Sequence, residues 1–172
     1  MCIRDSGGIP FVGGFRVTHN PALADLEFLA GEWDMEISNA PFLPSRDDTA
    51  HGHVTFEWIE DGALLMMRQS EQAGNPPSAR WAIGRDESGA DYTVLYCDMR
   101  GVSRIYEMCL MEGIWRLWRN TPGFSQRFEG RVSPDRKTIR SHWEKSFDGA
   151  TWEHDFDITY TRREDSRAAA EP

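Results

Sequence analysis

Hydrophobic and polar positions alternate along most of this chain in short runs. In the segment WDMEI, Trp33, Met35 and Ile37 are separated by acidic residues, and a period of two is typical of a half-buried β-strand. Similar runs recur about every 8 to 12 residues as far as residue 162, with turn-forming residues between them. The pattern predicts about ten short strands.

Only one helix is predicted, and it lies before the first strand. Asn20 and Pro21 precede the run ALADLEFLAG, where Asn20 can cap the helix and Pro21 suits its first position. We expect this helix to end at Gly31.

One helix followed by many short strands favours an antiparallel meander. Closure into a barrel would remove the exposed edges of such a sheet, and about ten strands leave room for an interior cavity. We therefore predict an all-β protein: an antiparallel up-and-down β-barrel of about ten strands with one short N-terminal helix. The barrel domain is expected over residues 20–163, after an unstructured or non-native leader (1–19) and before a flexible tail (164–172).

The last hairpin, residues 138–162, gives the most specific prediction. Asp148 and Gly149 suit a two-residue type I′ turn, which would place Trp143 opposite His154. In this register His154 would lie on the apolar inner face, where an imidazole can bind iron, transfer a proton or contact a ligand. It can equally be a core histidine that Ser141 or a buried water satisfies.

Composition narrows the range of partners. With 19 Lys and Arg against 28 Asp and Glu, the net charge of −9 repels phosphate backbones, so no nucleic acid partner is expected. No apolar run approaches the roughly 18 residues of a membrane span. Cys2, Cys97 and Cys109 form no ligand cluster, and we expect reduced thiols and a cytoplasmic location.

Several segments carry a resemblance to known proteins. LEFLAGEWD, FEWIEDGALLMMRQ, PGFSQRFEGRV and WEKSFDGATWEHDFDITYTR are similar to a family of uncharacterised bacterial lipocalin-like proteins, and Gly31-Glu32-Trp33 resembles the Gly-x-Trp motif of lipocalins. The resemblance implies a calycin-type barrel and no established reaction. It also implies that Trp33 lies at the closed end under a basic residue, for which Arg162 is the candidate. A more distant resemblance to nitrobindin-like haem barrels implies haem bound through His154.

The candidate ligand-binding residues are those that the favoured registers place inside the barrel or near His154. Aromatic side chains would form the wall, and amide groups would need polar partners that a ligand can supply. The facing of the strands between residues 102 and 119 stays open, because a shift of one residue in a neighbouring loop inverts it. The set is His154, Trp143, Phe128, Gln126, Gln69, Trp58, Phe56 and Tyr106.

The chain has no Gly-rich phosphate loop and no CxxC, HExxH or GxSxG motif. We therefore expect a lipocalin-like binding protein that holds a small hydrophobic molecule inside the barrel, with no cofactor and no metal, rather than an enzyme. Two alternatives remain open: a nitrobindin-like haem protein with His154 as axial ligand, and a cofactor-free isomerase or lyase that uses His154. Ile59, Leu64 and Met66 make the outer face of one hairpin apolar, and a second subunit in a homodimer or the N-terminal segment of the same chain could cover it.

Overall fold

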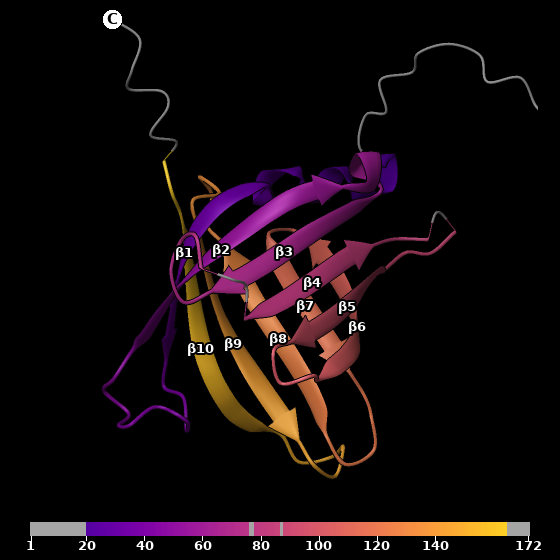
Figure 1. Ribbon diagram of the computed structural model, residues 1–172. Helices are drawn as coiled ribbons and strands as arrows, with labels where there is room; N and C mark the ends of the chain where they lie inside the picture. Colours follow the sequence, from indigo (N-terminus) through magenta and orange to yellow (C-terminus); the bar gives the residue numbers. More distant parts are fainter. Residues whose placement is uncertain (1–19, 76–77, 87, 165–172) are drawn as a thin grey trace, which may run out of the picture.

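In the computed structural model, which describes residues 20–75, 78–86 and 88–164, the chain forms a closed antiparallel barrel (Figure 1). Each strand pairs with its neighbours in sequence, and β1 closes the barrel against β10. The predicted fold class is confirmed. The strands are β1 (Gly31–Ser38), β2 (Ala50–Ile59), β3 (Leu64–Ser70), β4 (Ala79–Gly84), β5 (Tyr92–Asp98), β6 (Ser103–Met111), β7 (Ile114–Arg119), β8 (Ser125–Val132), β9 (Thr138–Ser146) and β10 (Glu153–Arg162).

The predicted helix is present as the 3₁₀-helix η1 (Pro21–Leu29), with Asn20 as its cap. A 3₁₀-helix has about three residues per turn, so Leu23, Leu26 and Leu29 share one face. All three are fully buried, with exposures of 0 to 1%. Their burial seats η1 across one end of the barrel (Figure 1).

The end covered by η1 is the closed end. Trp33 is completely buried there, and Arg162 of β10 lies over its ring. The contact expected between these two residues is therefore confirmed. No helix in the part of the chain that the structure describes is long and apolar enough to cross a membrane.

Two short turns set the registers of their hairpins. Met111 pairs with Ile114, so Glu112 and Gly113 form a two-residue turn with φ values of 53° and 74°. Between β2 and β3, the chain turns through the short 3₁₀ segment η2 (Glu60–Gly62), and Ile59 pairs with Leu64. Phe56 and Trp58 of β2 face the interior, as predicted.

The last hairpin differs from the prediction. A six-residue loop, 147–152, joins β9 to β10, because the carboxylate of Asp148 accepts hydrogen bonds from the backbone N–H groups of Ala150 (2.8 Å) and Thr151 (2.7 Å) and holds the loop open. Trp143 consequently pairs with Phe156, and a bulge lies between His154 and Phe156. The predicted pairing of Trp143 with His154 is wrong.

The strand facing between residues 102 and 119 is settled by the pairing. Arg104 pairs with Tyr96, and Arg119 pairs with Gln126, so both arginines face the interior. Tyr106, on the same face of β6 as Arg104, is 2% exposed. Arg116 faces outward and pairs with Glu129 at 3.1 Å.

The leader and tail predicted at the two ends lie outside the described residues, apart from Glu164.

Candidate functional site

A cavity of about 580 Å³ lies at the end of the barrel opposite η1. Phe42 and Met99, which are 61% and 81% exposed, line its rim, so the cavity reaches solvent there. Deeper in, its apolar lining includes Ile37, Trp81, Trp143, Phe156 and Ile158. The closed half of the barrel is filled with side chains, and the open half keeps this space.

Contacting aromatic rings form one wall of the cavity. The Trp81 ring centroid lies 4.5 Å from that of Tyr96, 5.5 Å from Tyr106 and 6.1 Å from Trp143. Trp143 in turn packs against Phe156 at 6.2 Å. Because each ring is held by its neighbours, this wall is a preformed apolar surface.

Two amide side chains supply polar groups to this wall. The Oε1 atom of Gln69 accepts a hydrogen bond from the indole of Trp81 at 3.2 Å. The Oε1 atom of Gln126 accepts two, from the hydroxyl of Tyr106 at 2.6 Å and from Arg104 at 2.9 Å. Burial raises the pKa of Tyr106, so its hydroxyl stays protonated at neutral pH and remains a donor.

Two ion pairs lie at or beside the cavity. Asp98 accepts from Arg100 at 2.6 Å, and the hydrogen bond from Arg100 is the main reason that the pKa of Asp98 lies well below its usual range. Lys145 lies 3.1 Å from Asp155, which the bulge in β10 turns toward the interior. Each of these pairs is internally neutralised.

Four of the predicted binding residues line the cavity: Trp143, Gln126, Gln69 and Tyr106. Phe128 is buried beneath the cavity and packs on Trp143 at 5.2 Å. Phe56 packs on Trp115 at 6.3 Å, and Trp58 lies further along β2 toward η2; neither contributes to the cavity lining. Half of the predicted set therefore lies at this cavity.

His154 lies on the outer face of the barrel, contrary to the prediction. Its side chain is 47% exposed, and its Nε2 atom lies 2.8 Å from Asp157. Burial would raise the pKa of Asp157, but hydrogen bonds from His154 and Asn39 outweigh that effect and lower it. The bulge causes the error, because one extra residue inverts the facing of the strand before it.

An outward His154 borders a surface hollow on β8, β9 and β10, not the interior cavity. The strand pairing also turns the other histidines of the described segments, His51, His53 and His142, toward the outer face. Within those segments, no group of three or more His, Cys, Asp or Glu residues could hold a metal ion. Cys97 and Cys109 are free thiols.

Sequence reasoning missed several cavity residues. Tyr96 was missed although the period of two in β5 places it on the face of Val94 and Tyr92. Arg104 lies in the segment whose facing stayed open, and Asp155 follows the predicted inward His154, so a regular strand would turn it outward. The first of these carried a usable signal, and the other two depended on the loops and the bulge.

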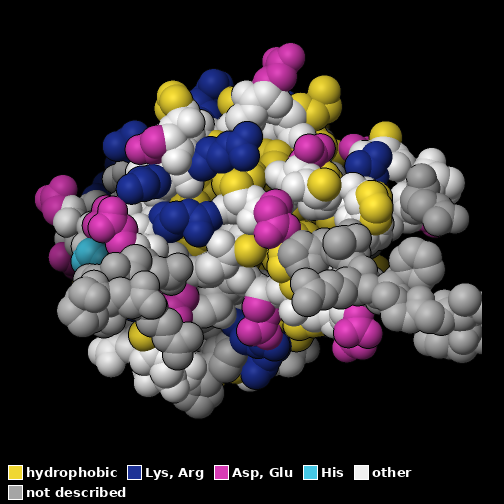
Figure 2. All heavy atoms as spheres, turned by 90° about the horizontal axis from the view of Figure 1, so that it is seen from above, with side chains coloured by type: hydrophobic (Ala, Val, Ile, Leu, Met, Phe, Trp, Pro, Cys, Tyr) yellow, Lys and Arg dark blue, Asp and Glu magenta, His cyan; other side chains and the backbone are white. Residues whose placement is uncertain are grey.

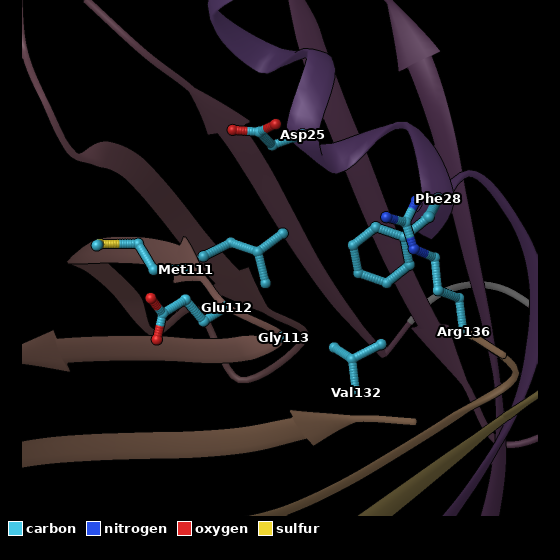
Figure 3. Close-up of a pocket in the computed structure, with 8 residues that line it drawn as sticks. Asp25, Phe28, Met111, Glu112, Gly113, Val132 and Arg136 are labelled. Atoms are coloured by element: carbon cyan, nitrogen blue, oxygen red, sulfur yellow. The ribbon is translucent and has the colours of Figure 1, made fainter. Parts of the chain in front are cut away.

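A second hollow, of about 480 Å³, lies outside the barrel at the closed end, between η1 and the turn after β6 (Figure 3). Its one aromatic side chain, Phe28, is already covered by Arg136 at 5.5 Å. Seen from this end, hydrophobic side chains show between Lys and Arg side chains (Figure 2). The hollow lacks the aromatic wall and converging donors of the interior cavity, which is therefore the better candidate site.

No family model matches the sequence, and no curated protein matches it. Among solved structures, the crystal structure of Rv2717c from M. tuberculosis is similar, with a TM-score of 0.54 over 86% of this chain and 100% of that chain. The two sequences are 12% identical. At this identity the similarity concerns the fold alone, and it agrees with the closed antiparallel barrel described above.

Proposed function

We propose that this chain is a lipocalin-like binding protein that holds a small, largely apolar molecule in the open half of its barrel. The observation that carries the proposal is the cavity of about 580 Å³ with its aromatic wall. Ligand sites are typically preformed concave spaces of about 300–1,000 Å³, mostly apolar, with a few fixed polar groups.

The residues suggest how such a ligand would be held. An apolar body lying along Trp81 and Trp143 would bury both its own surface and theirs, and each 100 Å² of buried apolar surface contributes about 2.5 kcal/mol before the entropic costs of binding. Gln69 and Gln126 present polar atoms on the same wall and would orient the ligand.

Neither alternative of the sequence analysis gains support from a specific observation. Haem ligation and acid–base catalysis both relied on an imidazole inside the barrel, and His154 lies outside it. The proposal therefore needs no cofactor and no reaction. A cytoplasmic location stays a prediction.

The test is a titration with the neutral fluorescent probe N-phenyl-1-naphthylamine, read by probe emission and by quenching of the tryptophans. We expect saturable binding, and loss of about tenfold in affinity in Ala79→Trp, because Ala79 is buried and lines the cavity, so an indole there would fill the space. Ala82→Trp is the matched control: Ala82 lies on the same strand but faces outward, opposite Leu95, and its variant should bind as the wild type does.

Absence of binding, or equal binding by both variants, would overturn the proposal. A strong Soret band on addition of hemin would instead favour a haem protein.

A further inference from the structure

Polar side chains from adjacent strands form a row across the inner wall. Arg119 of β7 pairs with Gln126 of β8, and Gln126 pairs with Lys145 of β9, so their side chains lie side by side on the inner face. Tyr106 reaches the same Gln126 from β6 through a hydrogen bond of 2.6 Å. Arg104 reaches it too, at 2.9 Å, and lines the cavity.

Two arginines in this row have no carboxylate partner among the described residues. Asp98 forms an ion pair with Arg100, and Asp155 forms one with Lys145. Arg104 contacts uncharged groups: the Gln126 amide oxygen, the Tyr106 hydroxyl and the face of Phe124, whose centroid lies 4.8 Å away. The site therefore has an excess positive charge, in a chain whose net charge is −9.

The row also has more hydrogen-bond donors than acceptors. The Nε atom of Arg119 is buried and has no hydrogen-bond partner in the described structure. The acceptor that these side chains share, Oε1 of Gln126, already receives two donors. The Nε2 group of Gln126 donates to no acceptor within the described segments. Buried donors and charges are costly unless an acceptor meets them.

We propose that the ligand is an amphipathic organic anion whose carboxylate binds at Arg104 and the amide N–H of Gln126, beside the charge of Arg119. This inference rests on the proposed function, since the apolar body would occupy the aromatic wall. A guanidinium binds a carboxylate through two parallel hydrogen bonds, and the low-dielectric surroundings strengthen that pairing. Burial keeps Tyr106 a neutral donor, so it does not compete as a second anion.

The experiment compares three ligands with the same twelve-carbon chain, dodecanoate, 1-dodecanol and dodecyl phosphate, as competitors of the neutral probe N-phenyl-1-naphthylamine. For the wild type, dodecanoate should displace the probe at about one tenth of the dodecanol concentration, the scale of one charge-assisted hydrogen-bonded pair. The preference should fall as salt concentration rises, because the rim is open to solvent.

Arg104→Met should abolish the preference for dodecanoate over dodecanol while still binding the neutral probe, which also shows that the variant is folded. Arg104→Lys should retain part of the preference, because the charge is kept and the paired geometry is lost. Arg116→Met, which removes an outward arginine from β7, is the matched control and should behave as the wild type.

The possible outcomes distinguish the anion inference from the proposed function. Equal displacement by dodecanoate and dodecanol from a protein that binds the neutral probe would overturn the anion inference and leave the proposed function standing. Failure of the wild type to bind any probe or competitor would overturn the proposed function itself. Stronger displacement by dodecyl phosphate than by dodecanoate would overturn the choice of a carboxylate.

Discussion

The guanidinium carbon of Arg162 lies 4.4 Å from the centroid of the Trp33 ring at the closed end of the barrel. The same guanidinium donates hydrogen bonds to the carbonyl oxygens of Phe28 and, at 2.9 Å, Ala30, while the Trp33 indole donates to Leu29 at 2.8 Å. Together the two side chains satisfy three carbonyls where η1 ends. This arrangement fastens the helix to β1 and β10 and keeps that end of the barrel shut.

Arg162→Met should therefore lower the free energy of unfolding by about 2–3 kcal/mol, because two carbonyls lose their donor and the cation–π contact is lost. Urea denaturation followed by tryptophan fluorescence measures the loss. Arg163→Met is the control: Arg163 is 42% exposed and pairs with Asp34 at the surface, so its removal should cost under about 1 kcal/mol. Equal losses in the two variants would contradict this role for Arg162.

The fold was predictable because its signals are local. The alternation of Trp33, Met35 and Ile37 with acidic residues predicts which side chains of β1 face inward. At Glu112 and Gly113, two successive residues with positive φ angles form a tight turn that needs no distant contact. Once ten such strands are placed in order, an antiparallel barrel is the arrangement that leaves no edge exposed.

The site was predictable only where strands are regular. Trp143 and Gln126 follow the plain alternation of β9 and β8, and both line the cavity. His154 and Asp155 exchange sides because of a single bulge, and the loop that produces it depends on how the Asp148 side chain bonds to the backbone. A competition between a tight turn and a side-chain-capped loop is not visible in residue pattern alone.

Asp148 should make stability depend on pH. Hydrogen bonds from the backbone N–H groups of Thr151 and Ala150 hold the pKa of its carboxyl below the usual range. The pKa of an Asp in the unfolded chain is about 3.9, so this stabilisation is complete at neutral pH. It declines as the pH approaches the unfolded pKa and is lost as the pH falls through the lower pKa of the folded state. The wild type should thus exceed Asp148→Asn in unfolding free energy by more at pH 7 than at pH 3. A difference that grows on acidification would refute the assignment.

The inward ion pair between Lys145 and Asp155 should show energetic coupling. Their side chains are 20% and 12% exposed, so removing one partner leaves a poorly solvated charge on the other. We expect Lys145→Met alone to cost about 2 kcal/mol and the double variant Lys145→Met/Asp155→Leu to cost less than the sum of the single changes by about 1 kcal/mol or more. A double-mutant cycle in urea measures the coupling. Additive losses would mean that the pair contributes no mutual stabilisation.

His154→Ala should leave ligand binding unchanged, since this side chain lies outside the barrel and bonds to Asp157. Trp143→Ala should instead weaken the binding of N-phenyl-1-naphthylamine by about tenfold, because a ring of the cavity wall is removed. The same titration serves both variants, with thermal denaturation to confirm that each is folded. The opposite ranking of the two variants would place the ligand in the outer hollow beside His154.

The homodimer suggested by the sequence stays a prediction, and the structure gives it a specific surface. Met66, Ala82, Leu95 and Ile105 pair in turn across β3 to β6, which places their side chains in one apolar row on the outer face. Leu95 and Ile105 are 50% and 65% exposed, and exposed apolar rows of this kind favour association.

We expect sedimentation to show a concentration-dependent dimer that Leu95→Lys shifts toward monomer. Thr93→Lys, two residues earlier on the same face but outside the row, should leave the equilibrium unchanged. A wild type that remains monomeric at the highest concentration would remove the hypothesis, because this row would then be no more than exposed side chains.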